Sequence, residues 1–108
     1  MRFSSPSKIL AARCMGDQRS YLLVFSAGGA SFEVFLPASW PDGIHGYMMP
    51  SIRNQVSSER SELPWAEAEK LAAQLLPLVS APDIAEGEQA AAREFVEAIR
   101  HGKRVGST

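Results

Sequence analysis

Cysteine is almost missing from this chain, because Cys14 is the only one among 108 residues. A lone cysteine excludes an internal disulfide and the paired thiolates of a cysteine-rich zinc site. Long apolar runs are missing as well. No stretch reaches the roughly 18–20 residues that a membrane helix needs, and Arg13 interrupts the short apolar stretch near the N-terminus, which is too brief for a signal peptide. We therefore expect a cytoplasmic protein without a membrane partner.

Catalytic and metal-binding motifs are also absent from the sequence. The two histidines, His45 and His101, have no spacing that is typical of a zinc site. Cys14 and His45 could act as nucleophile and base only if the fold brought them together, and the apolar neighbours of Cys14 instead predict a buried, inert thiol. We therefore predict no catalytic residues, no metal and no cofactor.

Basic residues form no broad pattern, and the net charge is −1. The one basic cluster, residues 100–104, falls at the end of the last predicted helix, where positive charge complements the helix dipole. Nucleic-acid-binding domains usually carry a wider basic face. We therefore expect no nucleic-acid partner.

What is present is an ordinary globular composition, with 45% hydrophobic and 21% charged residues. Residues 8–36 have the pattern of a β-meander. The nearly continuous apolar run over residues 21–27 is typical of a central strand with neighbours on both sides. The pair Gly28-Gly29 supplies the positive φ angles of a tight hairpin. Residues 31–36 then alternate with a period of two, which turns one set of side chains toward the core.

Residues 37–62 show no clear period and are interrupted by prolines and glycines. Irregular segments of this length are uncommon in compact domains. We therefore predict either a functional loop or a hidden fourth strand. The two candidate positions for that strand are Ile44–Met49 and Ile52–Val56.

Two helices are predicted in residues 63–101. Apolar residues recur at helical spacing over 63–79 and again over 81–101. Pro77 should end the first helix, since proline cannot continue the helical hydrogen bonding. Ser80 is the expected N-cap of the second helix.

The helices and the meander each present one apolar face, so they should pack together in two layers. We expect Leu75 and Phe95 to point inward, and we expect residues 102–108 to form a basic tail that is frayed from Val105 onward. The predicted fold class is α+β: a small antiparallel β-meander of three to four strands packed against a C-terminal helical hairpin. The whole chain, residues 1–108, is predicted to be a single domain.

Acidic charge is concentrated in residues 61–98, which hold eight acidic and two basic residues, a net charge of −6. Four exposed carboxylates of the helices are candidate partner-binding groups: Glu67, Glu69, Glu94 and Glu97. Such a charged helical face either is simply solvated or steers a basic protein partner.

The segment over residues 40–49 is the best candidate for an apolar contact. Aromatic residues and methionine are enriched in the cores of protein interfaces. The predicted partner-binding residues here are Trp40, His45, Tyr47, Met48 and Met49, with Arg53 as a nearby contact for a carboxylate or phosphate. The alternative is that these side chains cover the core where the meander ends.

Glu88 interrupts the apolar stripe of the second helix, and an unpaired carboxylate there would be costly. Arg13 is in phase with the inward side chains of the first strand. These two irregularities predict a buried ion pair between Arg13 and Glu88. The alternative is that Glu88 reaches solvent from an early turn of its helix.

Two hypotheses for function follow. The first is a non-catalytic protein–protein interaction module, such as an adaptor, a subunit or an immunity- or antitoxin-like inhibitor. A homodimer that pairs through an edge strand is its simplest version. The second is a small-ligand-binding protein or small enzyme with a pocket near His45, Tyr47 and Arg53.

Overall fold

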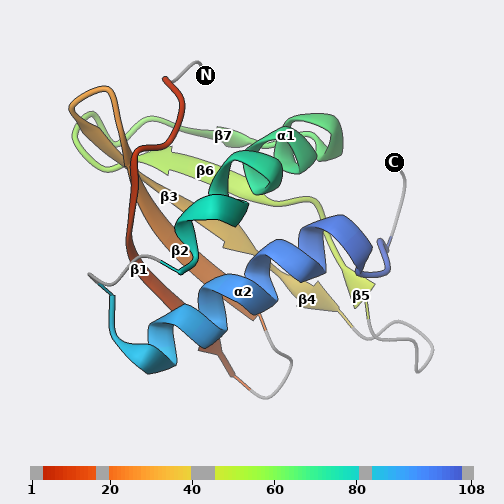
Figure 1. Cartoon of the computed structure of the whole chain (residues 1–108). Coiled ribbons are helices and arrows are strands. Elements are labelled where there is room, and N and C mark those ends of the chain that lie inside the picture. The colour runs from red at the N-terminus through yellow and green to blue at the C-terminus, as the bar shows by residue number, and fades with distance from the viewer. Residues whose placement is uncertain (1–3, 17–19, 40–45, 81–83, 106–108) are drawn as a thin grey trace.

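The computed structural model describes residues 4–16, 20–39, 46–80 and 84–105 (Figure 1). Its strands are β1 Lys8–Met15, β2 Ser20–Ala27, β3 Ala30–Leu36, β4 Ala38–Ser39, β5 Gly46–Tyr47, β6 Ser51–Asn54 and β7 Arg60–Glu62. Its helices are α1 Trp65–Leu75, the short 3₁₀ helix η2 Leu76–Leu78 and α2 Glu86–His101. The predicted α+β class is confirmed, because an antiparallel sheet packs against a C-terminal pair of helices.

The predicted meander forms the first part of the main sheet. Five strands lie in the order β1-β2-β3-β6-β7, and each pairs antiparallel with its neighbours. β2 has a neighbour on both sides, as its apolar run predicted. The turn between β2 and β3 consists of Gly28 and Gly29, whose φ angles of 58° and 82° lie in the left-handed region that a two-residue hairpin of this kind requires.

Residues 37–62 contain more strand than the sequence indicated. β6 pairs with β3 close to the expected position Ile52–Val56. It ends at Asn54, whose side-chain Oδ1 accepts hydrogen bonds from two backbone N–H groups that follow it and so starts a turn. Val56 therefore lies outside the strand and is 75% exposed. At the other expected position, Ile44–Met49, the described residues form β5, which pairs with β4 in a separate small sheet.

Prolines set the boundaries of the first helix. α1 begins directly after Pro64 and ends before Pro77, which falls in η2. The second helix is shorter than expected, since it begins at Glu86 rather than near Ser80. The prediction of a Ser80 cap is wrong: Ser80 lies in the turn after η2, and carboxylates in the first turn of α2 complement the positive end of its dipole instead.

The core lies between the helices and one face of the main sheet, because both helices cover the same side (Figure 1). Leu75 and Phe95 are fully buried, as predicted. Alternate residues of β2 and β3 point into this layer: Tyr21, Leu23, Phe25, Phe32, Val34 and Leu36. In the part of the chain that the structure describes, no helix covers the opposite face of the sheet.

A β-bulge in β1 changes which of its side chains face the core. The register shifts between Ile9 and Ala11, so Leu10 is an extra residue in this strand. Arg13, expected to point inward in phase with Ile9, is exposed because one extra residue moves the following side chains to the other face. Cys14, expected to be buried, is also exposed near the end of this edge strand.

The predicted basic tail, residues 102–108, is partly held against the fold. The backbone N–H of Tyr47 donates a 2.8 Å hydrogen bond to the carbonyl of Lys103, and the N–H of Val105 donates a 2.9 Å bond to the carbonyl of Tyr47. The expectation of fraying is therefore wrong for Val105. Residues 106–108 lie outside the described residues.

Arg104 connects α1 with the end of α2. Its guanidinium carbon lies 4.4 Å from the ring centroid of Trp65. Its Nη2 atom lies 3.0 Å from Oε2 of Glu69 and 3.5 Å from the carbonyl oxygen of Ile99. One side chain at the end of the chain thus bridges both helices.

Candidate functional site

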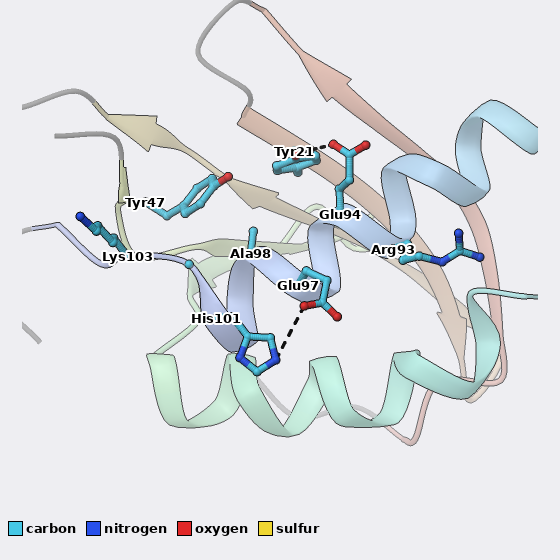
Figure 2. A pocket seen from close by; sticks show the side chains of 9 residues that line it. Tyr21, Tyr47, Arg93, Glu94, Glu97, Ala98, His101 and Lys103 are labelled. Carbon is cyan, nitrogen blue, oxygen red and sulfur yellow. Dashed lines mark hydrogen bonds and ion pairs between the residues drawn. The ribbon is translucent and has the colours of Figure 1, made fainter. Parts of the chain in front are cut away.

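A groove of about 520 Å³ lies between the second half of α2 and the strands β2 and β5 (Figure 2). Its lining combines charges of both signs with two aromatic rings: Tyr21, Tyr47, Arg93, Glu94, Glu97, Ala98, His101, Gly102 and Lys103. Figure 2 shows Arg93 and Lys103 toward opposite ends of the groove. Concave sites with a few convergent polar groups are where small ligands usually bind.

Tyr21 is the most strongly held polar group of the groove. Its hydroxyl donates a 2.7 Å hydrogen bond to Oε1 of Glu94. Burial first, and then Glu94, raise the pKa of Tyr21 well above its usual range. The ring of Tyr47 lies beside it, with the ring centroids 6.2 Å apart. Tyr21 therefore keeps its proton, and its single O–H bond is already directed at Glu94.

The predicted acidic residues are exposed, as expected: Glu67, Glu69, Glu94 and Glu97. Two of them have basic partners in the same chain. Arg104 pairs with Glu69, and Nε2 of His101 lies 3.7 Å from Oε2 of Glu97, an ion pair when the histidine is protonated. Arg104 therefore offsets part of the negative charge that the sequence places on the helices.

The predicted apolar contact segment is only partly within the described residues, because Trp40 and His45 lie outside them. Tyr47 is only 8% exposed and belongs to the core. Met49 is half-buried, whereas Met48 is 50% exposed. Among the described members of this segment, Met48 therefore offers the most accessible apolar surface.

Arg53 lies on the other side of the sheet from the groove. It pairs across the strands with Glu33, and its Nε is 3.4 Å from Oε1 of that residue. Its neighbour Ile52 points into the core, so strand alternation turns Arg53 to the opposite face. Tyr47 lines the groove on the helix side. The pocket predicted from His45, Tyr47 and Arg53 is therefore corrected: the sheet separates Tyr47 from Arg53, and His45 lies outside the described residues.

Glu88 has a backbone partner instead of the predicted arginine. Its side chain is half-buried, and Oε1 accepts a 3.2 Å hydrogen bond from the N–H of Ala12 in β1. Arg13 is exposed on the opposite face, and the ion pairs of the described residues do not join Arg13 to Glu88. The break in the apolar stripe does mark a specific contact, but the donor is an edge-strand amide.

A second candidate surface is the face of the main sheet that the helices leave uncovered, here called the open face. Over β1, β2 and β3 its apolar residues are Leu10, Ala11, Met15, Leu22, Val24 and Phe35, and its polar and charged residues are Lys8, Arg13, Ser20, Ser26, Ser31 and Glu33. Arg13, Leu22 and Phe35 form one cross-strand row, because each pairs with the next in register. Leu10 and Met15 are 42% and 37% exposed. Half of these side chains are apolar, and Leu22 and Val24 lie at the centre of the face with serines at both ends of the same strand.

One sequence signal could have found the open face. A strand with one face in water normally alternates between apolar and polar residues. β2 instead carries Leu22 and Val24 between its core residues, so the centre of its second face is apolar, with Ser20 and Ser26 at the two ends. The same apolar run predicts the central position of β2 in the sheet. It also indicates that the second face of this strand carries apolar side chains.

Among the described residues, no three His, Cys, Asp or Glu side chains gather as a set that could hold a metal ion. No helix in the same ranges is both long and apolar enough to cross a membrane. No protein-family profile, curated protein or solved structure matches this chain.

Proposed function

We propose that this protein is a non-catalytic protein–protein interaction module that binds its partner through the open face. The observation that carries the proposal is a group of half-buried apolar side chains at the centre of a sheet face that no helix covers in the described residues. Leu22 and Phe35 are cross-strand neighbours there, and Val24 follows on the same side of β2. Burial of apolar surface stabilises by roughly 25 cal/mol per Å², and contiguous exposed apolar patches commonly mark interaction sites.

The edges of the sheet are less suited to a partner than its face. β1 contains a bulge, and its Ala12 N–H already bonds to Glu88. β7 has three residues and carries Arg60 and Glu62. Bulges, short strands and charged side chains are features that disfavour edge pairing. A partner is therefore expected on the open face, and the edge-paired homodimer is disfavoured.

The acidic helices provide a second, weaker contribution. Exposed carboxylates that attract a basic partner would raise the association rate. This holds for an adaptor, a complex subunit or an immunity- or antitoxin-like inhibitor. Glu67 is exposed, and Glu94 and Glu97 lie on the rim of the groove. Exposed charges act mainly on encounter and specificity, so the apolar open face is expected to contribute most of the affinity.

Affinity capture from the native host, with matched variants, tests this proposal. Leu22→Lys places a charge in the open face. Leu76→Lys makes the same chemical change at a site that is 39% exposed on η2. We expect a specific protein to be retained by the wild type and Leu76→Lys and lost by Leu22→Lys. Equal retention by all three proteins contradicts binding through the open face.

A small-ligand role is the second candidate, favoured by the composition of the groove. Aromatic rings and carboxylates together suit a cationic group such as an amine, and Tyr21 and Glu94 meet there. Titration with small amines, followed by amide NMR shifts, tests it. Glu94→Gln should reduce the shifts, and Glu67→Gln, outside the groove, should leave them unchanged. Amines that shift no groove amide contradict this role.

A further inference from the structure

On the basis of this proposed function, we infer that the partner at the open face is a second copy of this chain. The two sheets pack face to face around a twofold axis that runs along β2. This inference rests on the proposed interaction role and adds the identity of the partner. It is carried by the apolar pattern of the open face and by the position of its charges.

The apolar residues of the open face are centred on β2. Leu22 and Val24 lie on that strand, Leu10 and Met15 lie on β1, and Phe35 lies on β3. A twofold axis along β2 places β1 of one copy opposite β3 of the other, so Leu22 and Val24 meet their own counterparts. Stacked sheets lie about 10 Å apart, which two layers of such side chains fill.

Two charged residues of the open face, Arg13 and Glu33, are placed to suit the same rotation. Arg13 shares a cross-strand row with Leu22 and Phe35, so the twofold axis brings Arg13 opposite Phe35 of the second copy. A guanidinium stacks favourably on an aromatic ring. Glu33 lies on the same strand as Phe35, two residues away and on the same face. Its carboxylate therefore attracts the guanidinium of Arg13 from the second copy. Each copy thus offers a cation where the other offers a ring and a carboxylate.

Arg13 is available for this contact. It is exposed, and in the described ranges it takes part in no ion pair. Glu33 is half-buried beside Arg53, so its carboxylate already has one cation and would gain a second at the edge of the interface. An isologous interface needs this kind of self-complementarity, since the same patch must serve both copies.

The size of the open face predicts the strength of the dimer. At about 4.8 Å between strands and about 3.4 Å per residue, β1, β2 and β3 present roughly 350–400 Å² per copy. Specific interfaces of standard size bury about 800 Å² per partner. The dimer is therefore expected at the weak end, with a Kd in the micromolar range.

Sedimentation equilibrium of the full chain, from micromolar to near-millimolar concentration, measures this association. We expect a monomer–dimer equilibrium for the wild type. Leu22→Lys should raise the Kd by about tenfold or more, because it places two ammonium groups at the twofold axis. Leu76→Lys should leave the Kd unchanged. Arg13→Glu should also weaken the dimer, and its matched control on α2, Arg100→Glu, should not.

Cysteine cross-linking tests the geometry even if Leu22→Lys folds poorly. In a Cys14→Ser background, Leu22→Cys places a thiol beside the twofold axis, and a short bifunctional thiol reagent should give a covalent dimer, because strands about 10 Å apart are too distant for a direct disulfide. Val56→Cys in the same background is the control, since Val56 is 75% exposed in the turn after β6, away from the axis. Cross-linking confined to Leu22→Cys supports the arrangement.

The outcomes separate this inference from the proposed function. A wild type that stays monomeric over the whole range overturns the second copy as partner. If Leu22→Lys then still loses a different protein in affinity capture, the interaction role stands with another partner. A dimer that Leu22→Lys does not weaken, or that cross-links equally through Val56→Cys, overturns face-to-face packing.

Discussion

Replacing Arg104 with alanine should destabilise the fold, although the sequence predicted only a basic tail at this position. The guanidinium stacks on Trp65, which is only 7% exposed, and this contact is worth about 0.5–2 kcal/mol depending on how far it is desolvated. The ion pair with Glu69 is half-exposed and adds at most about 0.5 kcal/mol. The 3.5 Å contact with the Ile99 carbonyl adds little.

The total loss for Arg104→Ala is therefore about 0.5–2.5 kcal/mol. For a chain of this length it corresponds to a fall in Tm of roughly 2–11 °C. Urea unfolding followed by far-UV circular dichroism, with thermal unfolding beside it, measures both quantities. Arg104→Lys should fall between the wild type and alanine, because lysine keeps the charge but lacks the planar group that stacks on the ring.

Arg100→Ala is the matched control for this prediction. Arg100 is exposed in the last turn of α2, and its removal deletes the same charge from the same region. Surface substitutions of this kind usually change stability by less than about 0.5 kcal/mol. If Arg104→Ala and Arg100→Ala lose the same small amount, the contacts of Arg104 with Trp65 and Glu69 do not stabilise the fold and the reasoning is refuted.

Three further predictions concern the core, the glycines and the groove. In urea unfolding, Leu75→Ala should lower the free energy of unfolding by about 2–5 kcal/mol and Leu76→Ala by about 0.5 kcal/mol or less. The reason is that Leu75 is fully buried whereas Leu76 is 39% exposed. Equal losses would mean that α1 turns another face toward the sheet. Gly87→Ala should stabilise the fold by about 0.5–1 kcal/mol, because Gly87 lies in α2 and a Cβ there has nothing within 4 Å. Gly46→Ala should destabilise the fold, because its Cβ would collide with Val105 and lie 3.1 Å from a backbone oxygen. A lower Tm for Gly87→Ala or a higher Tm for Gly46→Ala would contradict this packing. Because burial and Glu94 raise the pKa of Tyr21, the folded state holds this proton more tightly than the unfolded chain, so the stability that it contributes is complete below about pH 10 and is lost as the pH rises above that value. Unfolding measured at pH 9 and pH 11 should show a smaller alkaline loss for Tyr21→Phe than for the wild type, and equal losses would exclude Tyr21 as its source.

The parts of the fold that the sequence predicted correctly depend on local patterns. The turn at Gly28 and Gly29 requires positive φ angles that glycine adopts without strain, and Pro77 cannot continue a helix, so both features are visible within a few residues. The inward positions of Leu75 and Phe95 follow from helical spacing alone.

The errors arose where a distant part of the chain decides the local structure. Leu10 bulges out of β1, and this shift in pairing with β2 reverses the direction of Arg13. Glu88 found its partner on a backbone amide, which carries no sequence signature. β7 is polar and only three residues long, so pairing with β6 is what makes it a strand.

By itself, the sequence determined the α+β class, the meander and the apolar stripes of the two helices, because period and turn chemistry act between near neighbours along the chain. Only the tertiary structure decided which charges meet and which surfaces stay uncovered. Arg53 and Tyr47 are six residues apart, yet the sheet lies between them, whereas Arg104 reaches Trp65 across the fold. Strand register and helix placement set such contacts, and both are properties of the whole chain packed around one core.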